Sequence, residues 1–166
     1  MVVILCGCSS PPPKTHSDSN RGLEQQKNIA AAFGVNVHLS EGARKKLVDS
    51  KETIIVAGSF TGHPKEGTEA KYLDIKSGDV IVGDVQREIR PGETAEFSQL
   101  NLNPDAVSQT DSQGLHVLID VFSGRKSSKD NLLRCEVYDG ALESLSGRTI
   151  PIRCQLIVEP FSELGR

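Results

Sequence analysis

The chain is poor in aromatic residues: it contains no tryptophan, and aromatic residues make up only 4% of its 166 residues. Nucleic-acid sites commonly stack bases on aromatic rings, and many carbohydrate sites stack sugars in the same way. Both kinds of site are therefore disfavoured, with Tyr72 and Tyr138 the two tyrosines that could still contribute. Basic residues are not in excess either, because the formal net charge is −3. Nucleic-acid-binding domains usually carry a basic face, so we expect no nucleic-acid partner.

Long apolar runs and complete catalytic motifs are also missing. No apolar run approaches the roughly 20 residues that a membrane-spanning helix needs. The segment 58–62 places Ser59 one position too early for the Gly-x-Ser-x-Gly turn of serine hydrolases. The sequence contains neither a glycine-rich phosphate loop nor a calcium loop. We therefore expect a protein that is not an enzyme and that uses no cofactor.

The histidines lack the spacing of a metal site. Zinc sites often use pairs such as His-x-x-x-His, whereas the histidines here are His16, His38, His63 and His116. His116 and Asp120 share one face of an expected strand, but four residues of strand separate their Cα atoms by roughly 13 Å. That distance is too long for a general-base pair. We expect no bound metal, and we expect both side chains to face solvent.

The most specific motif that is present lies at the N-terminus, where an apolar run leads into Cys6-Gly7-Cys8-Ser9. Gly7 is small enough for a peptidase to cut after it, and the Cys8 thiol can take a diacylglyceryl group. The segment 5–8 resembles the lipobox of bacterial lipoproteins, in which the lipidated cysteine becomes the mature N-terminus. Only seven residues precede Cys8, fewer than a secretory signal needs, so we expect the signal to begin upstream of Met1.

This resemblance implies a location and a membrane partner. An acylated Cys8, carrying palmitate or similar chains, would anchor the protein to a lipid bilayer, since two or more chains hold stably. Ser9 follows the lipidated position, and in this respect the motif resembles those of outer-membrane lipoproteins. The resemblance implies an outer-membrane anchor in the cell envelope, with the protein facing the periplasm. We expect residues 1–7 to be a signal-peptide remnant, 8–34 a lipidated flexible tether, 35–160 a β-sandwich domain and 161–166 a tail.

From Val35 onward, short segments alternate apolar and polar residues, which is the pattern of half-buried strands. One short helix is expected at 40–48, with Ser40 as its N-cap. Strands are expected at 35–39, 53–60, 72–75, 80–89, 94–102, 115–122, 132–138 and 149–158, with loops at 62–67 and 103–114. The pattern predicts an all-β fold, an antiparallel two-layer sandwich of immunoglobulin-like or transthyretin-like type. A small closed barrel is the alternative architecture.

Two cysteines, Cys135 and Cys154, lie outside the N-terminal motif. Each falls on the apolar face of its expected strand. If the strands 132–138 and 149–158 pair around a turn centred on Ser144 and Leu145, Cys135 lies opposite Cys154, within the distance a disulfide accepts. Leftover cysteines of exported proteins usually pair, so we predict a Cys135–Cys154 disulfide.

One expected turn is unusually basic. Residues 124–129, called the basic turn below, bring together Arg125, Lys126 and Lys129 with two serine hydroxyls. Such a turn could hold a phosphate, a sulfate or the acidic surface of a partner. A solvated hairpin end is the simpler interpretation.

Together these features favour a lipid-anchored, non-catalytic envelope protein that binds another envelope protein, since sandwich domains commonly present loops and edges to partners. The alternative is a small-ligand or polysaccharide binding module that uses the 103–114 or the 124–130 loop. A hydrolase site assembled from distant residues is the least favoured interpretation.

Overall fold

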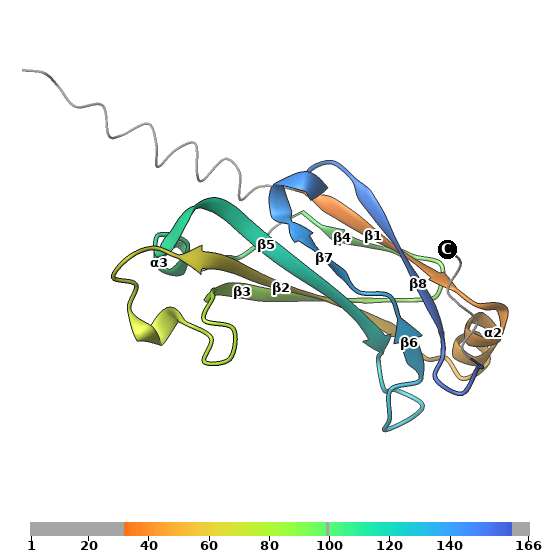
Figure 1. Cartoon of the computed structure of the whole chain (residues 1–166). Helices are drawn as coiled ribbons and strands as arrows, with labels where there is room; N and C mark the ends of the chain where they lie inside the picture. Colours follow the sequence, from red (N-terminus) through yellow and green to blue (C-terminus); the bar gives the residue numbers. More distant parts are fainter. Residues whose placement is uncertain (1–31, 99, 161–166) are drawn as a thin grey trace, which may run out of the picture.

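The computed structural model describes residues 32–98 and 100–160, which form a β-sandwich (Figure 1). Within these residues, eight strands make two four-stranded sheets: sheet A has the order β4-β1-β8-β6, and sheet B has the order β3-β2-β5-β7. The predicted all-β sandwich is confirmed. The strands of sheet A are β1 (Phe33–Leu39), β4 (Thr94–Phe97), β6 (Leu133–Cys135) and β8 (Thr149–Leu156). The strands of sheet B are β2 (Ile54–Pro64), β3 (Val80–Ile89), β5 (Thr110–Ser123) and β7 (Tyr138–Ala141).

The core lies between the two sheets, because apolar residues recur at every second position of the strands. In β2, Val56 and Phe60 are fully buried, whereas Ser59 and His63 face outward. In β5 the buried positions again alternate with exposed ones, among them His116 and Asp120, as expected. β5 lies inside sheet B, between β2 and β7, which agrees with its apolar character. Sheet B therefore has one buried face and one outer face.

The helix expected at 40–48 is present as α2 (Glu41–Asp49). Ser40 caps it as predicted, since its hydroxyl oxygen accepts a hydrogen bond from the Ala43 N–H. At the other end, the Lys51 N–H donates to the Val48 carbonyl and the Glu52 N–H donates to the Leu47 carbonyl. This double closure is a Schellman motif, and Lys51 takes the left-handed conformation that it requires, with φ of 55°.

Strands β1 and β8 pair in parallel, with Val35 opposite Ile150 and Val37 opposite Ile152. The antiparallel expectation is wrong for this pair, although the remaining strand pairs of the described residues are antiparallel. A tight turn forces antiparallel pairing on strands that follow each other in the chain. β1 and β8 are the first and last strands of the described residues, so no tight turn between them constrains their direction.

Cys135 and Cys154 form the predicted disulfide between β6 and β8, with their Cα atoms 4.0 Å apart. The strand register is also the expected one, since Leu133 lies opposite Leu156. The connection differs, because the strand expected at 132–138 is two strands: β6 stays in sheet A and β7 joins sheet B. The expected hairpin turn is instead the short helix η2 (Leu142–Leu145), on the path back to sheet A. Alternation alone cannot reveal this change of sheet, because both strands keep the same period.

Several other boundaries differ from those expected. The segment 72–75 is not an edge strand: η1 (Ala70–Tyr72) and a turn occupy it, with one bridge between Leu73 and Val80. The strand expected at 94–102 ends at Phe97, and β2 continues to Pro64 into the expected loop. The loop expected at 103–114 contains the short helix α3 (Pro104–Val107) and the start of β5. The Asn103 side chain caps α3, so the Asn-Pro pair is a helix-start signal in the sequence.

Candidate functional site

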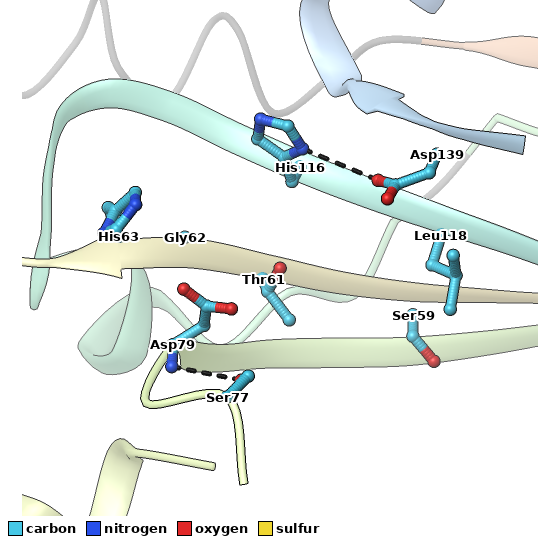
Figure 2. A pocket seen from close by; sticks show the side chains of 9 residues that line it. All are labelled: Ser59, Thr61, Gly62, His63, Ser77, Asp79, His116, Leu118 and Asp139. Atoms are coloured by element: carbon cyan, nitrogen blue, oxygen red, sulfur yellow. Dashed lines mark hydrogen bonds and ion pairs between the residues drawn. The ribbon is translucent and has the colours of Figure 1, made fainter.

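The outer face of sheet B is hollowed toward the end of β2 (Figure 2). The hollow has a volume of about 390 Å³. Its side chains come from three strands and from the loop before β3. The principal ones are Ser59, Thr61 and His63 of β2, His116 and Leu118 of β5, Asp139 of β7, and Asp79.

The strand register brings these side chains together. Thr61 lies opposite His116, and Ser59 lies opposite Leu118, in the antiparallel pair of β2 and β5. Leu118 in turn lies opposite Asp139 on β7. Opposite residues of an antiparallel pair share one face of the sheet, with Cβ atoms roughly 5 Å apart. The floor of the hollow is therefore a rigid, hydrogen-bonded surface.

The loop 73–79 forms one rim of the hollow and has a conformation fixed by its own polar groups. The Asp74 carboxylate accepts the N–H groups of Lys76 at 2.7 Å and Ser77 at 2.8 Å. Hydrogen bonds from the backbone of Ser77 and of Lys76 lower the pKa of the Asp74 carboxyl. The Ser77 hydroxyl accepts the Asp79 N–H at 3.2 Å, so this network also positions Asp79.

Among the described residues that line the hollow, the serine and histidine side chains are not hydrogen-bonded to each other. His116 Nδ1 and Asp139 Oδ1 are 3.7 Å apart, which is longer than a hydrogen bond. The Ser59 hydroxyl donates to Asp84 at 2.6 Å, and Ser59 lies within β2 rather than in a turn. A serine nucleophile needs a base within hydrogen-bond reach of its hydroxyl. Among the residues that the structure describes, no group of three or more His, Cys, Asp or Glu side chains could hold a metal ion.

The face around the hollow combines negative charge with exposed apolar side chains. Ile81 is 43% exposed and Leu118 is 44% exposed. Ile81 lies opposite Thr61, on the same face of the sheet. No lysine or arginine is among the described side chains that line the hollow. Asp79 and Asp139 line the hollow, and Asp84 and Asp120 lie beside it on the same face of the sheet.

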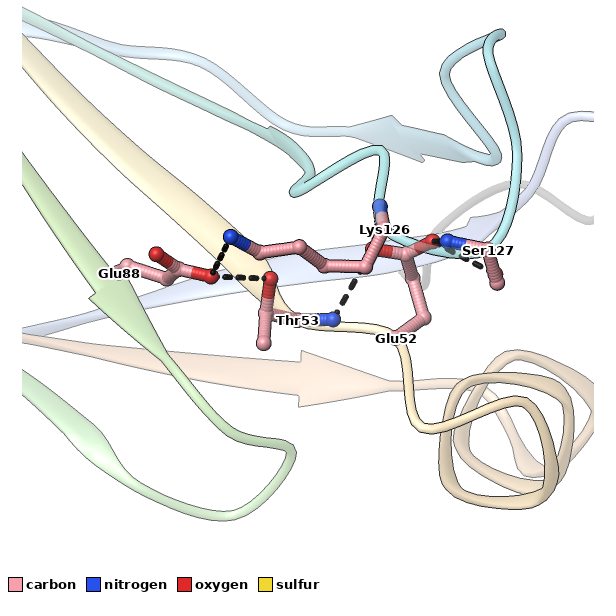
Figure 3. Close-up of polar contacts among 5 residues, drawn as sticks. All are labelled: Glu52, Thr53, Glu88, Lys126 and Ser127. Atoms are coloured by element: carbon pink, nitrogen blue, oxygen red, sulfur yellow. Dashed lines mark hydrogen bonds and ion pairs between the residues drawn. The ribbon is translucent and has the colours of Figure 1, made fainter.

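The basic turn lies at the other end of sheet B, beside the start of β2 (Figure 3). Its donors converge on the carboxylate of Glu52. The Lys126 N–H donates to Glu52 Oε1 at 2.9 Å, and the Ser127 N–H and hydroxyl donate to Oε2 at 2.7 and 2.6 Å. The Thr53 N–H also donates to Oε1, at 3.0 Å. The anion that the basic turn binds is therefore the protein's own Glu52 carboxylate.

The environment of Glu52 keeps its side chain charged. Glu52 is 2% exposed. Burial raises the pKa of its carboxyl, but hydrogen bonds from the Ser127 hydroxyl and from the N–H groups of Lys126, Ser127 and Thr53 together outweigh burial and bring the pKa to about 2. A carboxylate that accepts several backbone hydrogen bonds is stabilised in its charged form.

The three cations expected at this turn have different surroundings. Lys126 Nζ lies 3.0 Å from Glu88 Oε1, and the Thr53 hydroxyl donates to the same oxygen at 2.7 Å. Arg125 has a left-handed backbone, with φ of 57°. The side chains of Arg125 and Lys129 are exposed and have no bonding partner among the described residues. These two cations are the ones that remain available to an acidic partner.

The expected lipidation site, Cys8, lies outside the described residues, as do residues 9–31 of the tether and the tail 161–166. Within residues 32–98 and 100–160, none of the helices has both the length and the apolar character needed to cross a bilayer. The predicted anchor therefore remains a prediction from the N-terminal motif.

Comparisons of the chain with protein-family models, with curated proteins and with solved structures gave no match. Two features of the sites above were missed in the sequence. The hollow depends on strand register and on the fold of the loop 73–79, neither of which leaves a local signal. Glu52 stands just before an apolar strand, and its spacing gives no indication that a turn more than 70 residues later buries it.

Proposed function

We propose that this chain is a lipid-anchored protein of the cell envelope that binds another protein through the outer face of sheet B. The hollow in that face is the observation that carries the proposal. It offers the exposed apolar side chain of Leu118 among charged and hydroxyl groups, and the exposed Ile81 lies on the same face opposite Thr61. Protein interfaces commonly combine an apolar centre with a polar rim.

The exposure of the hollow favours a protein over a small ligand. The side chains of His116 and Asp139 are 61% and 73% exposed. A broad partner surface can contact such open side chains on three strands at once.

The charge of the face indicates what kind of partner surface fits it. Two carboxylates, Asp79 and Asp139, and no lysine or arginine are among the described residues that line the hollow. Complementary charge speeds association and selects partners, and its effect weakens as salt screens it. We therefore expect a partner with a positively charged contact surface and an association that weakens with ionic strength.

The envelope location is supported by two features at different places in the chain. The lipobox-like motif supplies the anchor at Cys8, and the Cys135–Cys154 disulfide is typical of proteins in oxidising compartments. Mass spectrometry of the protein isolated from native membranes tests the anchor. An acylated Cys8 at the mature N-terminus is expected, and an uncut, unacylated N-terminus would contradict it.

Two matched variants test the binding face. Leu118→Lys places a charge at the centre of the hollow. Ile157→Lys changes an apolar side chain of nearly equal exposure, 43% against 44%, in the turn after β8. After cross-linking in the native envelope, we expect the same partner to be recovered with wild type and with Ile157→Lys but not with Leu118→Lys. Equal recovery with all three proteins would contradict the proposed face and leave the anchor untouched.

A further inference from the structure

A second hollow lies between the end of α2 and the turn that joins β3 to β4. Its volume is about 550 Å³. Val48, which is 58% exposed, and the half-buried Pro91 provide an apolar surface over the buried Leu47. Cavities of a few hundred Å³ accept a single small molecule. The site is separate from the outer face of sheet B, and neither proposal depends on the other.

Two cations, Lys51 and Arg90, line this hollow beside the apolar floor. Neither side chain has a hydrogen-bonding or ionic partner among the residues that the structure describes. The nearby Glu93 carboxylate accepts the backbone N–H of Arg90, at 2.8 Å, rather than its guanidinium. Glu52 also borders the hollow, but both of its oxygens accept hydrogen bonds from the basic turn. The hollow therefore presents two unpaired cationic side chains beside an apolar surface, and the charged Glu52 carboxylate that borders it is only 2% exposed.

The backbone at Lys51 is unusual for a lysine. The left-handed conformation after a helix is most often taken by glycine, because a Cβ atom makes it sterically costly. The helix closure uses only the N–H of Lys51 and the N–H of Glu52. The lysine side chain takes no part in this closure, although its positive charge is favoured at the C-terminal end of the helix dipole. The same two N–H groups satisfy the carbonyls of Val48 and Leu47 near the end of α2.

We propose that this hollow binds a small amphipathic anion, an aliphatic chain that ends in a carboxylate or a phosphate. The aliphatic chain lies against Val48 and Pro91. The charged end lies between Lys51 and Arg90, where charge-assisted hydrogen bonds from both side chains hold it.

Amide-resolved NMR titration of the disulfide-bonded full chain tests the chemistry of the ligand. The probes are octanoate, octyl phosphate, neutral octanol and inorganic phosphate. Octanoate or octyl phosphate should shift the signals of residues 47–53 and 90–93, and the stronger of the two identifies the anionic group. Octanol and inorganic phosphate should each bind more weakly, because each lacks one half of the ligand. Equal affinity for octanol, or shifts produced only by anionic phospholipid vesicles, would overturn the proposal.

Three variants separate binding from folding. Lys51→Gly removes a cation and places glycine where the backbone favours it, so its melting temperature should equal or exceed that of wild type. Lys51→Gly and Arg90→Gln should each weaken binding of the preferred probe at least about threefold, the order expected for an exposed ion pair. Arg44→Gln removes the same charge from the exposed surface of α2, outside the hollow, and should bind normally. Wild-type affinity in Arg90→Gln, or an equal loss in Arg44→Gln, would overturn the proposal even if Lys51→Gly failed to fold.

Discussion

The Ser127 hydroxyl donates a hydrogen bond to the Glu52 carboxylate at 2.6 Å, although the two residues are 75 positions apart in the chain. With the N–H groups of Lys126 and Thr53, this bond ties the connection between α2 and β2 to the turn between β5 and β6. A buried carboxylate is tolerated in a protein only when it is satisfied in this way. The same group therefore determines the shape of both segments.

Replacing Glu52 should destabilise the fold. Glu52→Gln keeps the size of the side chain but turns one acceptor into an NH₂ donor that faces the N–H donors of the basic turn. We expect a loss of about 2–3 kcal/mol in the free energy of unfolding, the cost of unmatched buried hydrogen bonds to a charged group. Urea titration measures it. Glu88→Gln, at an exposed ion pair, should change stability by only about 0.5 kcal/mol. Equal effects of the two substitutions would contradict the role of Glu52.

The pKa of the Glu52 carboxyl predicts how the stability of the fold depends on pH. The pKa of Glu52 is about 2 in the folded protein, below its ordinary value of 4.5. As pH falls, the unfolded chain therefore binds a proton before the folded chain does, and stability decreases. The contribution is fully present above about pH 5 and should fall by about 3 kcal/mol between pH 5 and 2.

Urea unfolding at several pH values checks this expectation, with Glu52→Gln as the comparison because it cannot titrate at position 52. The variant should show a shallower loss of stability below pH 5. The pKa values of Asp74, Glu88 and Glu136 are also lowered, by hydrogen bonds from Ser77, Thr53 and Arg153 respectively. These groups are less buried than Glu52, so most of the acid dependence should disappear with Glu52. If the stability of wild type and of Glu52→Gln fell in parallel as pH decreases, other groups would account for most of the acid dependence.

Removing the disulfide should also destabilise the fold. Cys135 and Cys154 are 19 positions apart, and closing a loop of this size stabilises a fold by roughly 3 kcal/mol on the chain-entropy model. We expect the double variant Cys135→Ala, Cys154→Ala to lose about that amount, measured by urea unfolding under oxidising conditions. The reducing agent dithiothreitol should destabilise wild type by a similar amount and leave the double variant unchanged. An effect of the reductant on the double variant would contradict this assignment.

Replacing Gly42 by alanine should not give the stabilisation that this substitution usually gives in a helix. Gly to Ala inside a helix normally stabilises by roughly 1 kcal/mol. Here a Cβ atom at Gly42 would collide with the Glu159 carboxylate, which accepts hydrogen bonds from the Ser40 hydroxyl at 2.7 Å and the Leu156 N–H at 2.8 Å. We expect Gly42→Ala to be neutral or destabilising in wild type but stabilising in a Glu159→Ala background. Thermal unfolding of the four proteins measures the coupling, and additive effects would contradict it.

Much of the sandwich follows from local patterns, because burial on one face imposes a period of two on each strand. The apolar faces of both strands had to point inward, which allowed Cys135 and Cys154 to pair, but their register rested on an assumed hairpin that the structure replaces with β7 and η2. The change of sheet after Cys135 was not predictable, since alternation does not tell which sheet a strand joins. The hollow around Leu118 and the burial of Glu52 depend on contacts between distant segments. Such contacts are set by the whole fold and leave no local pattern.

The parallel pairing of β1 and β8 has a mechanical consequence. Six residue pairs, from Gly34 opposite Thr149 to Leu39 opposite Cys154, join the first strand to the last. Because the two strands run in the same direction, tension between the start of β1 and the end of β8 slides them along each other. In such shear the bonds of the ladder share the load and must rupture together, whereas peeling would break them one at a time. A domain pulled by its two ends should thus resist forced unfolding, which depends on the rate of crossing this barrier.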